Sequence, residues 1–333
     1  MVMTQSALNG FVIGVDVGGT KVAAGVVDRS GEIRVQERMP MVPTGEAAAG
    51  LNAVTAVIDS VSRRSAADPQ TQGTIRGIGI CSPGPLDPVA GLVINPPNVP
   101  CWRNYPLASE VANIYRVPVR LDNDANAAAL AEARWGAGRG CKNIFYATIG
   151  TGIGTGIVLD GKIFHGRTGA AGEGGHVSID YRGPQCACGK RGCIEAYASG
   201  PAIARRAREK LSTDGNRGSA IYELSSGNLE AVSSEIVGHA YEGGDQLATE
   251  ILEETVELLS AWLGNIVDLL DPEVIIVGGG VAAMLKPFFG EISRRLPQCS
   301  INSRAHEIPL VMARYGADAG IAGGAALCSE IVG

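Results

Sequence analysis

A short segment that combines three cysteines with a histidine constrains this chain more than any other feature of its sequence. Residues 172–195 read GEGGHVSIDYRGPQCACGKRGCIE and contain four potential metal ligands at the spacing H-x9-C-x-C-x4-C, namely His176, Cys186, Cys188 and Cys193. Thiolate sulfur and imidazole nitrogen are the ligands that Zn²⁺ prefers in a closed tetrahedral site. Gly189 and Gly192 stand between the cysteines, where a chain that wraps around a metal needs unusual backbone angles. We therefore predict a zinc-binding loop.

Two other interpretations of these cysteines remain open. One is a set of buried free thiols beside a surface histidine, and the other is a disulfide. Three clustered cysteines beside a histidine rarely arise from packing alone, and disulfides are rare in proteins of the cytosol. Glu173 and Glu195 flank the four ligands and cannot both be surplus ligands of a tetrahedral site. We expect the loop to hold both carboxylates in a polar binding site, with the zinc structural rather than catalytic.

The size and charge of the chain narrow the class of protein. Its 333 residues suggest about two domains. The net charge of -6 provides no basic field that would attract nucleic acid or an anionic membrane. The N-terminal segment MVMTQSALNG lacks the regions of a signal peptide, and no apolar run approaches the roughly 20 residues of a membrane span. The other cysteines stand singly, which favours a cytoplasmic protein with reduced thiols.

Glycine-threonine turns between apolar segments are candidate phosphate sites. Residues 11–16 and 22–28 are predicted strands, and between them Asp16 is followed by Gly18, Gly19, Thr20 and Lys21. The two glycines would let a phosphate approach the backbone, and a β-branched residue at Gly19 would resist the positive φ expected there. An ordinary hairpin is the alternative.

A second turn of this kind suggests two arms that close on one polyphosphate. It spans residues 150–156, includes Thr151 and Gly152, and lies between predicted strands at 143–148 and 157–159. A third glycine run follows the predicted strand 273–277 and opens a helix; it consists of Gly278, Gly279 and Gly280. Such a turn fits a nucleotide base or ribose, although a lone GGG is weak evidence.

A polar run at the end of another predicted strand is the candidate catalytic segment. The strand 117–121 leads into DNDAN (residues 122–126), and an alanine-rich helix follows as far as Trp135. Open α/β sheets place active groups at strand ends, so Asp124 is a candidate catalytic residue. A helix N-cap is the alternative role for Asp124, and the two roles are compatible. Asn98, in a proline-braced loop, is either a turn residue or a polar contact to a ligand.

Apolar residues at helical spacing predict helices over residues 46–64 and 245–270. A basic helix over 201–211 is expected to carry its charges on a solvated face. Residues 212–228 are predicted to be a loop, and the last helix is predicted over 318–331.

In combination the motifs resemble the ROK family (repressor, open reading frame, kinase) of the actin-like ATPase superfamily. The resemblance runs from Asp16 to the last helix, and these motifs stand in the family's order: DVGGTK, SPGPLD, DNDAN, GTGIGTG, EGGH, CACGKRGC, IEAYASG and VGGG. Within the family the chain resembles the bacterial glucokinases. The N-acetylmannosamine kinases share almost the same cysteine block.

The resemblance implies an α/β protein with the two-domain actin-like ATPase (ribonuclease H-like) fold and an inter-domain cleft. The small domain would contain residues 1–121, completed by a C-terminal helix over 317–333. The large domain would contain residues 122–316 and carry the zinc loop.

The resemblance also implies an ATP-dependent kinase for the 6-hydroxyl of glucose or a related hexose, with Asp124 as the general base. The ATP phosphates would contact the turn from Gly18 to Lys21 together with Thr151 and Gly152, and Mg²⁺ would bridge them near Asp16. The adenosine would lie near residues 278–280. His176 would bind zinc and direct its other nitrogen toward the sugar. The sugar-binding set would be Gly84, Asn98, Asn123, Asp124, Glu173, His176 and Glu195.

The alternatives are a kinase of N-acetylmannosamine or another N-acetylhexosamine, and a sugar-responsive repressor or sensor. A repressor needs a DNA-reading element, and only about ten residues precede the first predicted strand. A sensor should lack Asp124 or the phosphate turns. The preferred hexose and the use of polyphosphate in place of ATP stay open. The resemblance alone suggests a homodimer or homotetramer.

Overall fold

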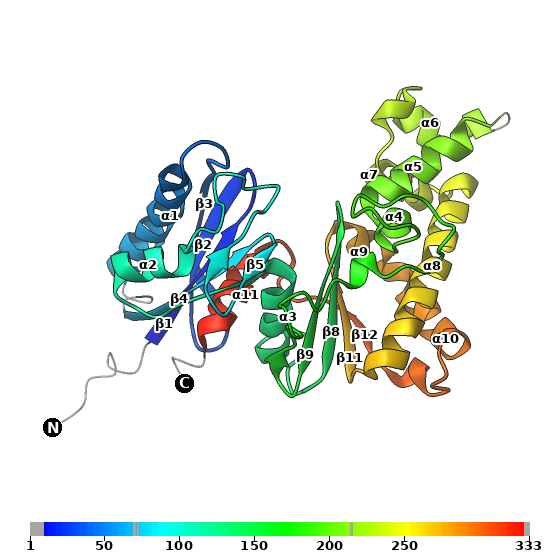
Figure 1. Ribbon diagram of the computed structural model, residues 1–333. Helices are drawn as coiled ribbons and strands as arrows, with labels where there is room; N and C mark the ends of the chain where they lie inside the picture. Colours follow the sequence, from blue (N-terminus) through cyan, green and yellow to red (C-terminus); the bar gives the residue numbers. More distant parts are fainter. Residues whose placement is uncertain (1–9, 69–70, 72, 214–215, 330–333) are drawn as a thin grey trace. The chain divides into compact units, whose positions relative to one another are not determined.

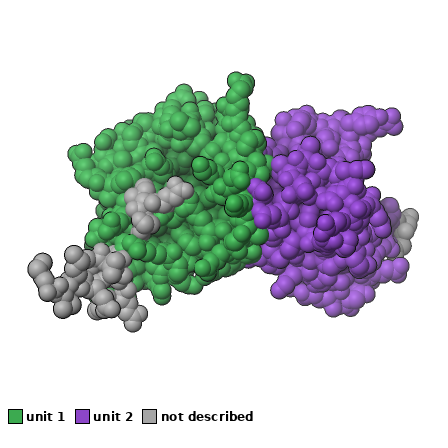
Figure 2. Space-filling view, turned by 90° about the horizontal axis from the view of Figure 1, so that it is seen from below, with its two compact units in different colours: residues 1–142, 156–171, 314–333 green, residues 143–155, 172–313 purple. Residues whose placement is uncertain are grey.

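The structure is a computed structural model, and it describes residues 10–68, 71, 73–213 and 216–329. The chain forms two compact units, each assembled from segments that are separated in the sequence (Figure 2). Unit 1 contains residues 1–142, 156–171 and 314–333, and unit 2 contains residues 143–155 and 172–313. Within the described ranges, no helix is both long enough and apolar enough to cross a membrane.

Unit 1 is built around a five-stranded sheet with the order β3-β2-β1-β4-β7 (Figure 1). The antiparallel strands β1 (Gly10–Val17) and β2 (Lys21–Val27) confirm the strands predicted over residues 11–16 and 22–28, and β3 (Ile33–Pro40) pairs antiparallel with β2. β4 (Thr74–Ser82) and β7 (Val119–Asn123) run parallel to β1. The carboxyl ends of β1, β4 and β7 therefore lie at one edge of the sheet.

Helices cover both faces of this sheet. Alternate residues of β1 point to opposite faces, so neighbouring residues of the strand lie in two different cores. Ile13 packs in a core with apolar residues of α1 (Ala47–Ala67) and α2 (Leu107–Tyr115). On the other face, Val12 packs with α11 (Ala319–Cys328), which also contacts α3 (Asp124–Arg134). A Cβ at Gly14 or Gly79 would overlap the backbone of α11, so these glycines allow the close approach of helix and sheet. β5 (Leu86–Asp87) and β6 (Leu92–Val93) form a separate two-stranded antiparallel sheet.

The second sheet has the order β10-β9-β8-β11-β12. In unit 2, β8 (Ile144–Ile149), β11 (Val274–Gly278) and β12 (Leu310–Met312) are parallel. β9 (Ile153–Leu159) carries the chain from unit 2 into unit 1 and pairs with β10 (Lys162–Ile163). The helices of unit 2 are α4 (Glu195–Ala198), α5 (Gly200–Leu211), α6 (Ala220–Leu224), α7 (Ser234–Glu242), α8 (Gln246–Leu270), α9 (Gly280–Leu285) and α10 (Phe289–Cys299).

Some predicted boundaries are wrong. Residues 212–228 are not all loop, because Ser219 caps α6 and Ile221 is buried. The turn predicted over 150–156 is shorter, since β9 already begins at Ile153. The described part of the last helix ends at Cys328, and residues 330–333 of the helix predicted there lie outside the described residues.

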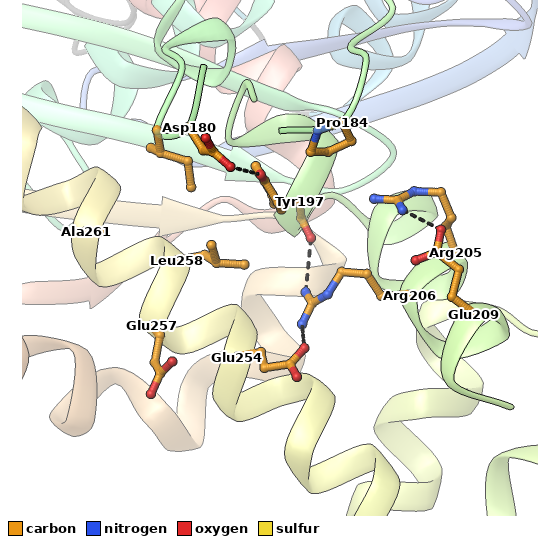
Figure 3. Close-up of a pocket in the computed structure, with 11 residues that line it drawn as sticks. Asp180, Pro184, Tyr197, Arg205, Arg206, Glu209, Glu254, Glu257, Leu258 and Ala261 are labelled. Atoms are coloured by element: carbon orange, nitrogen blue, oxygen red, sulfur yellow. Dashed lines mark hydrogen bonds and ion pairs between the residues drawn. The ribbon is translucent and has the colours of Figure 1, made fainter. Parts of the chain in front are cut away.

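The expectation that the charges of α5 all face solvent is also wrong. Arg206 is only 8% exposed, because α8 lies beside α5. Its guanidinium donates to Glu254 Oε2 at 2.7 Å, to Thr255 Oγ1 at 2.9 Å and to the carbonyl of Ile251 at 3.0 Å. Arg206 and Glu254 both line a cavity of about 570 Å³, and Figure 3 shows the hydrogen bond between them. None of the predicted site residues lines this cavity.

Candidate active site

The carboxyl ends of the parallel strands bring polar residues of unit 1 together. In the strand register, Asp16 of β1 lies beside Cys81 of β4, and Cys81 lies beside Asp122 of β7. Asn123 ends β7, and Asp124 is the first residue of α3. Asp16 and Asp124 are close enough for the charge on Asp124 to raise the pKa of Asp16.

Asp16 is a carboxylate in a poorly hydrated position. Part of its surface stays accessible, yet burial raises its pKa from 3.8 to about 6, the charge on Asp124 adds to the shift, and Arg38 opposes it. A Cβ at Gly320 would overlap the Asp16 carboxylate, so the glycine makes room for it. Sequence reasoning missed Gly320, for which the only local signal is the glycine-rich run of the last helix.

The structure corrects the alternative role considered for Asp124. The N-cap of α3 is Asn123, whose Oδ1 accepts hydrogen bonds from the backbone N–H groups of Ala125 at 2.9 Å and Asn126 at 3.4 Å. Asp124 lies one residue inside the helix and is exposed, and its Oδ1 accepts from the N–H of Ala125 at 2.8 Å. Because Asn123 is the cap, the helix start does not depend on a cap at Asp124.

The first glycine turn is a tight hairpin between β1 and β2, closed by a 2.9 Å hydrogen bond from the N–H of Gly18 to the carbonyl of Lys21. The expected positive φ at Gly19 is wrong, since neither Gly18 nor Gly19 has one. Gly19 is instead restricted by space, because a Cβ there would come within 2.8 Å of the Asn98 carbonyl oxygen. The turn therefore lies against Asn98, and Thr20 and Lys21 at its tip are exposed.

Gly84 lies beside Asn123, another of the predicted sugar-binding residues. A Cβ at Gly84 would be 3.8 Å from Nδ2 of Asn123. Unit 1 thus places Gly84 next to Asn123, and Asn98 next to the glycine turn.

The four predicted metal ligands of unit 2 converge on one point. The ligand atoms of His176, Cys186, Cys188 and Cys193 all lie within 4.8 Å of one another. The sulfurs of Cys188 and Cys193 are 3.6 Å apart, as are Cys186 Sγ and His176 Nδ1. Zinc–sulfur bonds of about 2.3 Å place two sulfurs of a tetrahedron about 3.8 Å apart, whereas a disulfide bond measures about 2.05 Å. The cluster is compatible with a structural zinc site, and the cysteines are not paired as disulfides.

The backbone of the predicted zinc-binding loop has the geometry that its glycines predict. Gly189 and Gly192 have φ values of +91° and +71°, in the left-handed region that favours glycine. A Cβ at Gly192 would also overlap the carbonyl oxygen of Asp180. The loop closes through a 2.8 Å hydrogen bond from the N–H of Cys186 to the carbonyl of Lys190.

The loop also packs against the second glycine-threonine turn. The N–H of Gly174, next to Glu173, donates to Thr155 Oγ1 at 2.7 Å. At the other end of the loop, Glu195 Oε2 accepts from the N–H of Ile153 at 2.8 Å. A Cβ at Gly152 would come within 2.7 Å of the same carboxylate oxygen. The carboxylate of Glu195, which is expected to bind the sugar, therefore lies beside Gly152, which is expected to bind phosphate.

A cavity of about 470 Å³ lies beside this turn, wholly within unit 2. It is lined by Gly150 and Thr151, and by Gly280 at the start of α9. The preceding Gly279 has a φ of +93°, and a Cβ there would overlap the carbonyl of Ile149. The space next to Gly280 is open, with nothing within 4 Å of a Cβ built there. Two of the predicted nucleotide segments thus share one cavity.

Another part of the cavity lining was missed by the sequence analysis. Arg208 of α5 lies there, together with Ser233, Ser234 and Glu235 at the start of α7. Ser233 caps α7 by accepting from the N–H of Ile236 at 3.3 Å. A serine before an apolar helical pattern signals such a cap, but nothing in the sequence indicates that the cap faces the second turn.

Comparisons with known proteins agree on one family. The glucokinase of Thermotoga maritima is 34% identical over 97% of this chain and 98% of its own length. A ROK family glucokinase from Streptomyces griseus, solved in complex with glucose and AMPPNP, is 33% identical, with a TM-score of 0.77 over 96% of this chain and 99% of that one.

Relatives of other kinds match as well. The N-acetylmannosamine kinase of Citrobacter koseri is 28% identical over 95% of this chain and 97% of its own length. A xylose repressor of Caldicellulosiruptor bescii is 30% identical over 89% of this chain but only 71% of the repressor. The fold is the two-domain actin-like ATPase fold of the ROK sugar kinases. The family model described as "ROK family" matches residues 12–331, and the chain therefore belongs to the ROK family.

Proposed function

We propose that this protein is a glucokinase, which transfers the γ-phosphoryl group of ATP to the 6-hydroxyl of glucose. The observation that carries the proposal is the exposed carboxylate of Asp124 at the start of α3, directly after β7 and within electrostatic reach of Asp16. A sugar hydroxyl must lose its proton as it attacks phosphorus, and a carboxylate at hydrogen-bond distance can accept it. We assign this general-base role to Asp124. Similarity to glucokinases over nearly the whole chain supports the assignment.

The other polar residues are assigned to the two substrates. The sugar hydroxyls are bound by the amide, carboxylate and imidazole groups that can satisfy several of them at once; these come from Asn98, Asn123, Glu173, His176 and Glu195, with Gly84 beside Asn123. The phosphates bind to the turn from Gly18 to Lys21 and to Thr151 and Gly152. The cavity beside Gly280 accepts the adenosine, since its volume is in the range of small-molecule sites.

Two metal ions belong to the proposal. Asp16 and Asp124 are two carboxylates close to each other, and carboxylate oxygens are ligands that suit Mg²⁺. Asp16 would hold the ion, which would neutralise charge on the transferred phosphoryl group. His176 and the three cysteines would hold Zn²⁺, whose contribution is to cross-link the loop between Glu173 and Glu195. The chain's own residues do the binding and the proton transfer.

The test is a panel of sugars offered to the purified protein with ATP and Mg²⁺. We expect glucose to give the highest kcat/KM, with 6-phosphate as the product by NMR. Higher kcat/KM for N-acetylmannosamine or N-acetylglucosamine would overturn glucose as the substrate and support an N-acetylhexosamine kinase. No turnover of any sugar, with retained sugar binding, would favour a sensor or repressor. Replacing ATP by polyphosphate in the same assay identifies the phosphoryl donor.

Two further expectations rest on the family resemblance. We propose that the protein acts in the cytoplasm, where ATP and glucose meet and thiols stay reduced. We also propose a homodimer or homotetramer, which light scattering coupled to size-exclusion chromatography would measure directly. A monomeric mass at micromolar concentration would contradict it.

A further inference from the structure

Asp122 is a buried carboxylate immediately before the proposed base. It is 3% exposed, and both of its carboxylate oxygens have partners. Oδ1 accepts from the backbone N–H of Asn123 at 2.8 Å and from Nδ2 of Asn126 at 3.2 Å. Oδ2 lies 2.7 Å from Nε2 of His165. Asp122 therefore connects the turn that carries Asn123 to a histidine 43 residues further along the chain.

His165 follows β10 and lies in unit 1, as Asp122 does. Its side chain is 32% exposed and borders a cavity of about 270 Å³. The charged groups around that cavity are Arg120 of β7, Arg134 of α3 and Lys162 of β10, beside Asp122 itself. The hydrogen bond with Asp122 raises the pKa of His165, while burial opposes the shift. A neutral imidazole with its proton on Nε2 donates the same hydrogen bond, so the contact does not require a charged histidine.

We propose that the His165–Asp122 pair is a positioning element, which holds the Asn123–Asp124 turn where Asp124 can accept the proton of the substrate. The inference rests on the general-base role proposed for Asp124. Neither residue of the pair touches the reacting atoms. Asp122 acts through the N–H of Asn123 and the side chain of Asn126, and His165 acts by fixing the orientation of the Asp122 carboxylate.

The loss of the imidazole would leave a buried carboxylate oxygen without its donor. Such an oxygen turns toward water or toward another donor, because an unsatisfied buried acceptor is costly. Turning the Asp122 carboxylate pulls on both hydrogen bonds that its other oxygen accepts. A misplacement of about 1 Å at a reacting group costs up to about 100-fold in rate. We therefore expect His165→Ala to lower kcat by about 10- to 100-fold. The KM for ATP should change little, because the hydrogen bonds that join Asp122 and His165 to other described residues do not reach the β1–β2 turn.

The experiment compares His165→Ala with His165→Gln in the full chain. A glutamine amide nitrogen can take the place of Nε2 and donate to Asp122, so it should restore kcat to within a few-fold of wild type. His306→Ala is the matched control, because His306 is exposed and lies outside the proposed site. Steady-state kcat and KM for both substrates are measured with a thermal melt on each preparation. Hydrogen exchange of the peptide covering residues 122–126 is measured by mass spectrometry, which does not require activity.

We expect faster exchange of this peptide and a lower kcat in His165→Ala, with both restored in His165→Gln. A kcat within twofold of wild type in His165→Ala, or equal loss in the two variants, would overturn the positioning role. If the alanine variant does not fold, the glutamine variant decides: near-native exchange and kcat support the pair, and impaired values refute it. If wild type phosphorylates no sugar, the proposed kinase function fails, while the exchange comparison still determines whether the pair holds the turn.

Discussion

Replacement of Asp16 by asparagine should stabilise the protein while removing its activity. The pKa of Asp16 is raised from 3.8 to about 6, first by burial and then by the charge on Asp124. A shift of this size corresponds to about 3 kcal/mol of destabilisation of the ionised folded state. Asparagine keeps the size of the side chain and carries no charge. We expect Asp16→Asn to raise the free energy of unfolding by about 1 to 3 kcal/mol at pH 7. The gain can fall below the full value because the asparagine must still satisfy its own polar groups.

The pH dependence gives the sign of the effect. Between pH 3.8 and about 6, folded Asp16 keeps a proton that the unfolded chain has released. The unfolded state then binds fewer protons, so the free energy of unfolding falls as pH rises through this window. The destabilisation is absent below pH 3.8 and complete above about pH 6. The Asp16→Asn variant lacks this contribution, so its advantage over wild type should grow across the same window.

The assay is thermal melting of both proteins from pH 4 to 8, without nucleotide or divalent metal. A gain of 1 kcal/mol raises the melting temperature by about 2 to 4 °C for a domain of 150 to 250 residues. Asp87→Asn is the control for loss of a carboxylate that accepts backbone hydrogen bonds in an exposed turn. Parallel pH profiles for Asp16→Asn and wild type, or a less stable variant at pH 7, would refute the reasoning. Full kinase activity in the variant would separately refute Asp16 as the group that holds Mg²⁺.

Three further predictions test the proposed site. Asp124→Asn should lower kcat by about 10²- to 10⁴-fold with a smaller change in KM and an unchanged fold, because Asn123 is the helix cap; near-native kcat would eliminate Asp124 as the base. Gly19→Val should raise the KM for ATP. It should also raise the KM for glucose, because a Cβ there meets the carbonyl of Asn98. Unchanged ATP kinetics would mean that the turn is only a hairpin. Cys188→Ser should remove most bound zinc by elemental analysis and weaken glucose binding by about 10- to 100-fold, and ATP binding less; a native protein without zinc would end that argument.

The sequence predicted the local elements of unit 1 well, because their signals are local. Apolar runs broken by glycine turns correspond to β1 and β2, and the DNDAN run lies where a parallel strand becomes a helix. The convergence of the four proposed metal ligands was predictable for a similar reason, since His176 and the cysteines occupy one short segment and all have side chains that can bind a metal. The positive φ values of Gly189 and Gly192 follow from the same local argument.

The features that sequence reasoning missed depend on partners that are distant in the chain. In the sequence, Arg206 has the pattern of a solvated charge on α5. In the fold it pairs with Glu254 of α8, which is 48 residues later in the chain. Gly320 resembles any other glycine of an alanine-rich helix until the helix packs against Asp16. His165 has no local signal, because its role depends on Asp122. Helical and strand periodicity predict which face of an element is buried. They do not predict which polar group of a distant segment packs against that face.

Glu195 links the proposed zinc cluster to the second glycine-threonine turn as well as to the proposed sugar site. Its Oε2 is committed to the N–H of Ile153, where β9 leaves the second glycine-threonine turn. Its Oε1 lies 3.8 Å from Nδ1 of His176 and 3.9 Å from Sγ of Cys186, two of the predicted zinc ligands. One carboxylate thus connects the proposed zinc cluster to the turn proposed to bind phosphate, and it would offer Oε1 to a sugar hydroxyl. Loosening of the cluster would therefore shift the turn as well as the sugar-binding residues, which is why both substrates should respond to Cys188→Ser.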